Sequence, residues 1–245
     1  MIVANQGSNY LLKRGTLNMK LAKAVNQVQP SYIREILSAA TDPKVISMAG
    51  GLPDDNTFPI TLMANSLKNL TKRPELFQYG NTQGYQPLLD YLKNQYALPD
   101  SHDGIVCTGS QQGLDLIARA FIDSGDTIVM EAPSYLGAIQ VFGLARANIE
   151  SVTQTPDGPD ISELKKIFET NRVKLFYAVP DFHNPTGVCW SNDTRLQVAE
   201  LCKKYNVTLI EDVPYRELRF NGENLPLVSS YCPENAVVLR SFSKI

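Results

Sequence analysis

The chain has 245 residues, of which 43% are hydrophobic, and a formal net charge of -2 at pH 7. This composition supports a sizeable folded core, and the mixed charges indicate neither a nucleic-acid groove nor a membrane-binding surface. Four widely separated cysteines, without a C-x-x-C pair and with only two histidines, make a zinc site or a disulfide framework unexpected. The first twenty residues lack the apolar core of a signal peptide, and no apolar run approaches membrane-spanning length. We therefore expect a cytoplasmic protein without a metal site.

The first hundred residues indicate helices and loops. An amphipathic helix is expected within residues 24–40, and a loop rich in proline and glycine, AGGLPDDNTFP, follows it. Residues 60–70 and 85–98 then space their apolar side chains as helices do.

From residue 104 onward, short apolar runs alternate with helical stretches. Strands are expected in GIVCTG, DTIVMEAP, KLFYAVP, VTLIEDVP and AVVLRSF. Helices are expected in QQGLDLIARAFI, YLGAIQVFGLA, ISELKKIFET and TRLQVAELCKKYN. Apolar strands that alternate with helices are typical of an α/β fold, with a mostly parallel sheet covered by helices on both faces.

Four polar motifs stand where the expected strands end: TGSQQG, PDFHNPTG, EDVPY and SFSK. In parallel sheets, ligands bind beyond the carboxyl ends of the strands. The order of the motifs therefore predicts one ligand site assembled from four strand ends.

The first of these motifs, TGSQQG, indicates an anion site at the start of a helix. The hydroxyl group of Ser110 and the N–H groups of Ser110 and Gln111 would be the donors. The alternative is structural, with Ser110 serving only as the helix N-cap. Neither a G-x-G-x-x-G nor a Walker pattern is present, so a dinucleotide or a nucleoside triphosphate is not indicated.

The motif EDVPY places two acids at the end of a buried strand. A carboxylate there needs a partner, and Asp212 is the better candidate for an ion pair with a protonated ring nitrogen. Glu211 alternates to the opposite face of the strand, where a helix lysine is its expected partner.

The remaining two motifs supply an amide and an amine. FHNPTG is a turn signal, and it is either a plain loop or a means of aiming the Asn184 amide at a ligand oxygen. A desolvated Lys244 at a strand exit could form a Schiff base with an aldehyde. An amine, an acid, an amide donor and an anion site are the four groups that pyridoxal phosphate needs.

Seven motifs in register resemble the fold-type-I pyridoxal-phosphate aminotransferases of class I/II, and most closely their kynurenine/2-aminoadipate aminotransferase branch. The motifs run from about residue 45 to residue 244: ISMAGGLPDDNTFP, YGNTQGYQPLLDYL, TGSQQGLDL, EAPSYLGA, FHNPTG, EDVPY and SFSK.

The resemblance implies a role for each site residue. Lys244 would be the catalytic Schiff-base lysine and the base that removes the α-proton, and Asp212 would pair with the pyridinium ring nitrogen. Tyr135 would stack its ring over the cofactor, and Asn184 and Tyr215 would bind the phenolic oxygen. The remaining residues would bind the phosphate or the substrate: Ser110, Gln111, Ser241 and, more weakly, Ser243 at the phosphate, Tyr79 at the phosphate of a neighbouring subunit, and Gly51, with Asn184, near the substrate carboxylate. A core or turn role is the alternative for Tyr79, Tyr135 and Gly51.

The resemblance also implies how the chain is organised. Residues 1–60 would form an N-terminal arm, a helix and a substrate loop, and residues 61–245 the cofactor-binding large domain. The chain stops just after Lys244, before the two arginines and the C-terminal small domain that such enzymes carry. It is therefore expected to be the N-terminal part of a longer enzyme, with little activity alone, that forms homodimers with shared active sites.

The expected activity is transamination between an L-amino acid (2-aminoadipate, aromatic or branched-chain) and a 2-oxo acid such as 2-oxoglutarate. Another reaction on the same cofactor, such as that of a β-lyase, decarboxylase or racemase, stays open. So does the aminotransferase-like effector domain of a transcription regulator, although only about forty-five residues, without a basic helix pair, precede ISMAGG. A fragment that binds the cofactor without catalysis is the remaining alternative.

Overall fold

The computed structural model describes residues 22–27, 46 and 53–244. These residues fall into two compact units, and the expected helix within 24–40 lies largely outside the described residues. The smaller unit comprises residue 46 and residues 53–106, and the larger unit comprises residues 22–27 and 107–244.

The smaller unit is built from helices and loops. It contains α2 (Ile60–Leu70) and α3 (Gln86–Gln95), which confirm the two helices predicted there, and the 3-10 helices η2 (Asp55–Thr57) and η3 (Pro74–Phe77). The strand expected at residues 104–109 is wrong, because none of these residues is in a strand. The N–H group of Val106 instead donates to the carbonyl oxygen of Gln83, a loop residue.

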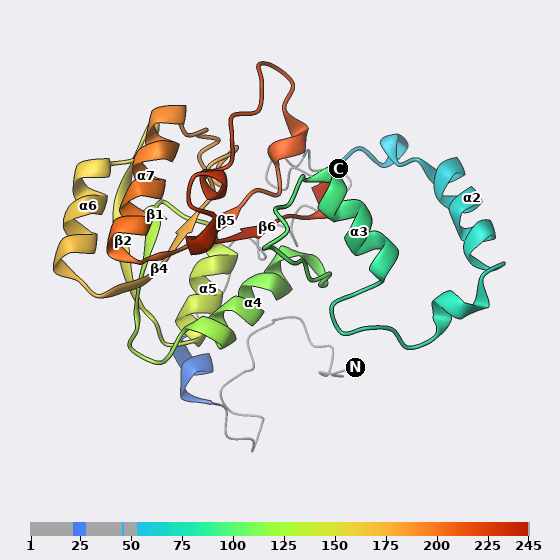
Figure 1. The fold of residues 1–245 in the computed structure, drawn as a ribbon, viewed down its shortest axis with the longest axis horizontal. Coiled ribbons are helices and arrows are strands. Elements are labelled where there is room, and N and C mark those ends of the chain that lie inside the picture. The colour runs from blue at the N-terminus through green and yellow to red at the C-terminus, as the bar shows by residue number, and fades with distance from the viewer. Residues whose placement is uncertain (1–21, 28–45, 47–52, 245) are drawn as a thin grey trace. The chain divides into compact units, whose positions relative to one another are not determined.

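The larger unit contains a six-stranded sheet (Figure 1). Its strands are β1 (Thr127–Ala132), β2 (Asn148–Thr155), β3 (Gly158–Pro159), β4 (Val173–Ala178), β5 (Thr208–Asp212) and β6 (Ala236–Leu239). The order in the sheet is β3-β2-β1-β4-β5-β6, and every neighbouring pair is parallel except the short β2–β3 pair. The predicted α/β class with a mostly parallel sheet is confirmed.

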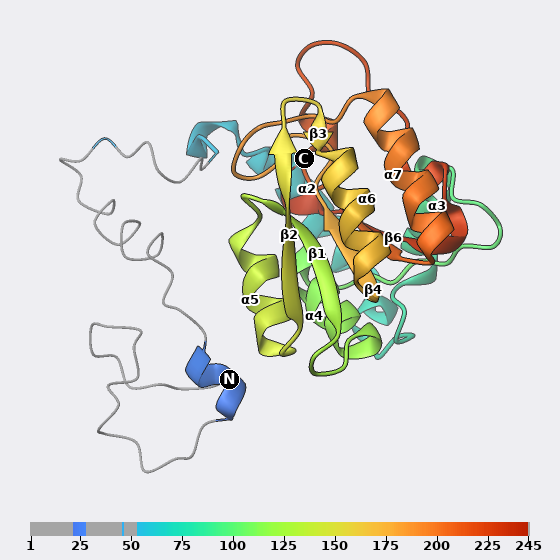
Figure 2. The same ribbon diagram turned by 90° about the vertical axis from the view of Figure 1, so that its left-hand side faces the viewer.

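Helices cover both faces of this sheet, as the two views show (Figures 1 and 2). The long helices are α4 (Gly109–Phe121), α5 (Leu136–Leu144), α6 (Ile161–Thr170) and α7 (Asn192–Tyr205). One face packs against α6 and α7 and the other against α4 and α5. The short 3-10 helices of this unit are η1 (Lys23–Gln27), η4 (Arg216–Leu218), η5 (Val228–Ser230), η6 (Pro233–Asn235) and η7 (Phe242–Lys244).

Alternation along β1 shows why the successive residues Ile128 to Met130 are all apolar. Val129 packs into the cluster beneath α6 and α7, while Ile128 and Met130 pack into the cluster beneath α4 and α5. A strand buried on both faces needs apolar side chains at successive positions.

Strand β2 was not predicted from the sequence. Val152 is its only fully buried residue, and most of its other side chains are exposed or half-buried. Its outer neighbour is only the two-residue β3, so polar side chains are tolerated and the apolar signal is weak.

None of the helices in the described ranges is long and apolar enough to cross a membrane. The same residues contain no group of three or more His, Cys, Asp or Glu side chains that could hold a metal ion.

Candidate active site

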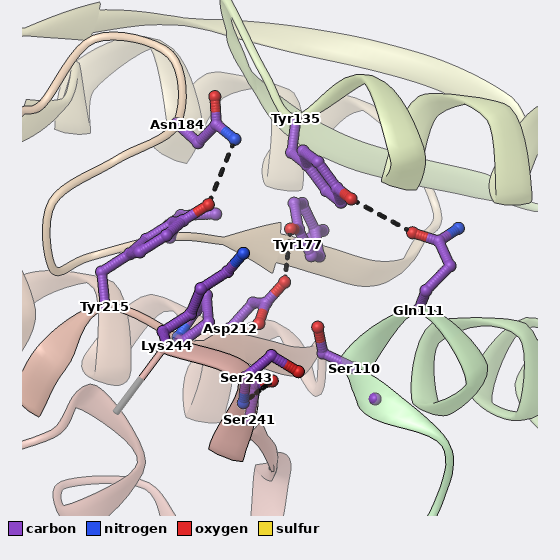
Figure 3. A pocket seen from close by; sticks show the side chains of 13 residues that line it. Ser110, Gln111, Tyr135, Tyr177, Asn184, Asp212, Tyr215, Ser241, Ser243 and Lys244 are labelled. Atoms are coloured by element: carbon purple, nitrogen blue, oxygen red, sulfur yellow. Dashed lines mark hydrogen bonds between the residues drawn. The ribbon is translucent and has the colours of Figure 1, made fainter. Parts of the chain in front are cut away.

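A cavity of about 210 Å³ lies where the parallel strands of the larger unit end (Figure 3). Its lining residues are Gly109, Ser110, Gln111, Tyr135, Tyr177, Val179, Asn184, Asp212, Pro214, Tyr215, Ser241, Ser243 and Lys244. All predicted site residues except Tyr79 and Gly51 are therefore brought to one cavity. Tyr79 belongs to the smaller unit and is fully exposed, and Gly51 lies outside the described residues.

One wall of the cavity is the first turn of α4. The N-cap of this helix is Thr108, whose side chain makes no capping hydrogen bond. Ser110 is the second residue of the helix, so it is not the N-cap that the structural alternative required. The first N–H groups of an α-helix have no intrahelical acceptor, and they carry the positive end of the helix dipole. This turn therefore offers donors suited to a phosphate group.

Asp212, the last residue of β5, supplies a negative charge that can pair with a cation. Its side chain is buried, and its Oδ2 accepts a hydrogen bond of 2.8 Å from the hydroxyl group of Tyr177. Burial raises the pKa of Asp212 to about 6, and the hydrogen bond from Tyr177 lowers it in part. Its Oδ1 is buried without a hydrogen-bond partner among the described residues. A buried oxygen of this kind fits a positively charged N–H donor supplied by a ligand.

Glu211 faces the other side of β5. Its two oxygens accept hydrogen bonds from the backbone N–H groups of Val228 and Ser229, at 2.8 and 2.9 Å. The expected helix lysine is therefore wrong as its partner. The free N–H groups at the start of η5 satisfy the carboxylate instead, so Glu211 anchors η5 to the sheet and lies outside the cavity.

The amide, phenol and amine groups follow three neighbouring strands: Asn184 comes after β4, Tyr215 after β5 and Lys244 after β6. The Nδ2 of Asn184 donates to the hydroxyl oxygen of Tyr215 across 3.4 Å. The Nζ of Lys244 lies 6.0 Å from the centroid of the Tyr215 ring. Figure 3 shows these three side chains pointing into the cavity, with Ser241 and Ser243 below Lys244. The backbone N–H of Ser243 donates to Oγ of Ser241 across 3.1 Å.

A buried acid and a buried histidine support the loop that carries Asn184. Oε1 of Glu131 accepts hydrogen bonds from Trp190 and Gln154, and its Oε2 lies 3.8 Å from Nε2 of His183. Burial raises the pKa of Glu131 to about 7 and lowers that of His183 to about 4. His183 is therefore neutral at pH 7 and lies outside the cavity lining, which fits a structural role.

An ionic cluster around Asp181 also holds this loop. Asp181 is completely buried and lies 2.8 Å from both Arg195 and Arg216 and 3.5 Å from Arg219. Because one buried carboxylate joins α7 to η4 and the residue after it, the loop is fixed between two elements of the larger unit.

Tyr177, which lines the cavity near the end of β4, was not predicted as a site residue. The signal was present, because a tyrosine next to the apolar residues Leu175 and Phe176 of a buried strand needs a partner for its hydroxyl group. Tyr177 pairs with Ile210 across the sheet, so Asp212 lies two residues beyond its partner, on the same face.

The sequence matches the family described as "Aminotransferase class I and II" over residues 43–245. The chain belongs to this family of aminotransferases. It is 37% identical over 233 residues to an aromatic-amino-acid aminotransferase of Thermococcus litoralis, covering 89% of the chain and 55% of the relative. It is 33% identical over 229 residues to a 2-aminoadipate transaminase of Thermus thermophilus, covering 91% and 57%.

Solved aminotransferase structures share the fold. A kynurenine aminotransferase of Pyrococcus horikoshii, solved with PMP, superposes with a TM-score of 0.85 at 33% identity, covering 92% of the chain and 59% of that structure. The chain thus spans somewhat more than half the length of these aminotransferases. It is also 30% identical over 258 residues to an uncharacterized HTH-type transcriptional regulator of Escherichia coli, of which it covers 55%.

Proposed function

We propose that this chain is the cofactor-binding part of a pyridoxal-phosphate-dependent aminotransferase that transfers an amino group between an L-amino acid and a 2-oxo acid. The observation that carries the proposal is the unpartnered Oδ1 of Asp212, buried in a cavity that also holds the amine of Lys244 and the uncapped start of α4. A cationic ring nitrogen, an aldehyde and a phosphate match these three features, and one cofactor carries all of them.

The lining residues fit this cofactor in the roles that the sequence predicted. Asp212 would hold the proton of the ring nitrogen, and Asn184 and Tyr215 would bind the phenolic oxygen. Tyr135 would stack on the ring. Ser110, Gln111, Ser241 and Ser243 would bind the phosphate, with Tyr79 of a second subunit as a further ligand.

When bound, pyridoxal phosphate supplies an aldehyde and an electron-withdrawing ring. Lys244 would bind that aldehyde and, once released from it, accept the α-proton of the amino acid at Nζ. Asp212 would hold the proton on the ring nitrogen by pairing with its positive charge, which is the state in which the ring withdraws electrons. The orphan Oδ1 is the atom that can accept this N–H.

We propose aromatic donors or 2-aminoadipate, with 2-oxoglutarate as the acceptor, because relatives named for these donors are among the similar proteins. Branched-chain amino acids are to be assayed as donors alongside them. Gly51 would lie near the substrate carboxylate, and a homodimer would complete each site with Tyr79. The chain's similarity to a transcriptional regulator supports a second candidate, an effector domain that binds the cofactor without turnover.

The decisive experiment traps the cofactor on the full-length protein. The protein is incubated with pyridoxal phosphate, reduced with borohydride and digested, and the labelled peptide is sequenced by mass spectrometry. The proposal expects the label on Lys244 and its loss in Lys244→Ala. A label on a different lysine would overturn the site.

Turnover separates the two candidate functions. Each donor is incubated with 2-oxoglutarate, and glutamate is measured. An aminotransferase forms glutamate with at least one donor, whereas an effector domain carries the label on Lys244 and forms none.

A further inference from the structure

Gly137 is the second residue of α5 and lies two residues after Tyr135, the tyrosine that the proposed function places over the cofactor. Because it lies inside a helix, its backbone does not require glycine, and the requirement is one of space. An ideal Cβ at this position would lie 2.6 Å from both Cε1 and Cζ of Tyr135 and 2.6 Å from Oε1 of Gln111. Non-bonded carbon atoms prefer separations of about 3.5–4.0 Å. The edge of the phenol and the end of the amide therefore occupy the volume that a methyl group would take.

The same three residues are linked by hydrogen bonds. The hydroxyl group of Tyr135 donates to Oε1 of Gln111 across 3.3 Å, and Nε2 of Gln111 donates to the carbonyl oxygen of Gly137 across 3.3 Å. Figure 3 shows the Tyr135 hydroxyl and the Gln111 side chain meeting on one side of the cavity. The amide of Gln111 thus connects the first turn of α5 to the ring of Tyr135, and both bonds need the side chains to lie close to Gly137.

We propose that Gly137 is a positioning residue. Because it has no side chain, the Tyr135 ring and the Gln111 amide can pack against it and form their hydrogen bond. That bond holds the ring in the place where it stacks on the cofactor. The proposal rests on the proposed function for the identity of what stacks on the ring. Gln111 then has two roles: its side chain holds Tyr135, and its backbone N–H belongs to the proposed anion site.

The geometry also separates this role from a contribution to folding. The atoms that an added methyl group would meet are the far ends of two side chains, and no backbone atom is among the three nearest. Tyr135 is half-buried and faces the cavity, so its ring has room to swing away. Alanine is a better helix former than glycine, so Gly137→Ala should leave α5 intact while displacing the ring.

The same helix provides a matched control. Gly143 also lies in α5, and a Cβ there would meet nothing within 4 Å. Gly143→Ala makes the same chemical change in the same helix without touching Tyr135 or Gln111.

The test compares the wild type, Gly137→Ala and Gly143→Ala in the full-length protein. The apo proteins are unfolded thermally, and the affinity and absorption spectrum of bound pyridoxal phosphate are then measured. We expect Gly137→Ala to weaken cofactor binding by roughly threefold to tenfold, the range set by one lost aromatic stacking contact. Its absorption maximum should shift, and its apo melting temperature should equal or exceed that of the wild type. Gly143→Ala should bind as the wild type does.

A double-mutant cycle checks that the effect passes through Tyr135. In a Tyr135→Ala background, Gly137→Ala should cause no further loss of cofactor affinity. The proposal would be overturned if Gly137→Ala kept the wild-type cofactor affinity and absorption spectrum. It would also be overturned if Gly137→Ala lowered the cofactor affinity as much in the Tyr135→Ala background as in the wild type.

A readout without the cofactor keeps this inference separate from the proposed function. Nitration of Tyr135 by tetranitromethane, followed by mass spectrometry, is compared between apo Gly137→Ala and apo Gly143→Ala. Faster nitration in Gly137→Ala supports the displaced ring, and equal rates overturn it. If the wild type fails to bind pyridoxal phosphate at Lys244, the proposed function is wrong, and this comparison still decides the place of the ring.

Discussion

The hydroxyl group of Tyr177 donates to Oδ2 of Asp212 across 2.8 Å, and Oδ1 of the same carboxylate has no partner among the described residues. Both side chains are buried. Burial raises the pKa of the Tyr177 hydroxyl well above its usual value, so it stays protonated and donates. The carboxylate, which belongs to the cavity lining, is thus oriented by one hydrogen bond while its second oxygen is left without a partner among the described residues. This arrangement suits a group that must meet a cationic ligand at one defined atom.

Asp212→Asn keeps the shape of the side chain and removes its charge. In the proposed function the ring nitrogen would lose its proton at neutral pH without that charge, so we expect turnover to fall by about 10²–10⁴, the usual contribution of a positioned acid or base. In the proposed function Lys244 binds the aldehyde without help from Asp212, so borohydride should still fix the label on Lys244. Steady-state rates and the reductive labelling are measured on one preparation. Near-normal turnover in Asp212→Asn would contradict the role of this carboxylate.

Tyr177→Phe removes one hydroxyl group and keeps the ring that packs edge-on against Phe142 at 5.9 Å. The hydrogen bond lowers the pKa of Asp212, so its loss should raise that pKa above the present value of about 6. Only the ionised carboxylate pairs with a cation, so cofactor affinity falls as pH drops through this pKa. The acid limb of an affinity profile from pH 5 to pH 8 should therefore move to higher pH. Superimposable profiles for Tyr177→Phe and the wild type would show that this hydrogen bond does not tune Asp212.

The strands that the sequence predicted correctly each contain a short apolar run, and together these runs supply side chains to the clusters on both faces of the sheet. Strand β6, at the edge, has the apolar run although three of its four residues are only half-buried. Strand β2 escaped prediction because its polar side chains face outward, with Val152 as its only fully buried residue. The apolar run at residues 104–109 was misleading for a different reason. None of these residues is buried, and Ile105 is 65% exposed, so a short apolar run indicates by itself neither burial nor a neighbouring strand for pairing.

The candidate site could be assembled from the sequence because parallel strands end at one edge of a sheet. Chain order therefore brings Asn184, Asp212 and Lys244 together, although their spacing in the sequence is large. Ser110 reaches the same cavity from the first turn of α4, which no strand directly precedes. Relations across the sheet could not be predicted in this way. The bond from Tyr177 to Asp212 depends on strand register, and the space at Gly137 depends on the rotamers of two other side chains. Neither leaves a motif in the sequence.

Asp181→Asn tests whether the loop that carries Asn184 is held by charge. The substitution leaves Arg195 fully buried without its carboxylate, and breaking a buried ion pair in this way costs about 3–5 kcal/mol. Urea unfolding of the apo protein should therefore show a large loss of stability. Glu75→Gln removes the exposed ion pair with Arg73 and should give no measurable change. If the two variants lose equal stability, the buried cluster contributes no more than a surface pair.

Glu131→Gln tests the buried acid behind the same loop through the pH dependence of folding. The carboxyl group faces Gln154, Trp190 and the neutral His183, and no described cation pairs with it. Burial raises its pKa from 4.5 to about 7, so the folded state holds this proton in a pH range where the unfolded chain has lost it. Wild-type stability therefore falls as pH rises from 4.5 through 7.

Glutamine has no proton to lose, so Glu131→Gln should be free of this penalty. At pH 5 the variant and the wild type should have similar free energies of unfolding, because the wild-type carboxyl is protonated in the folded state. At pH 8 the variant should be the more stable one, by up to about 3 kcal/mol, since each pKa unit corresponds to about 1.4 kcal/mol. Urea unfolding of the apo protein at both pH values measures the difference, and Glu200→Gln, an exposed position on α7, controls for the loss of one negative charge. A stability difference that is the same at pH 5 and pH 8 would mean that Glu131 keeps an ordinary pKa inside the fold. The ionised carboxylate would then need a stabilising contact inside the fold. One such contact would be an N–H group of His183 closer to Glu131 than the 3.8 Å that separates the two side chains in the structure.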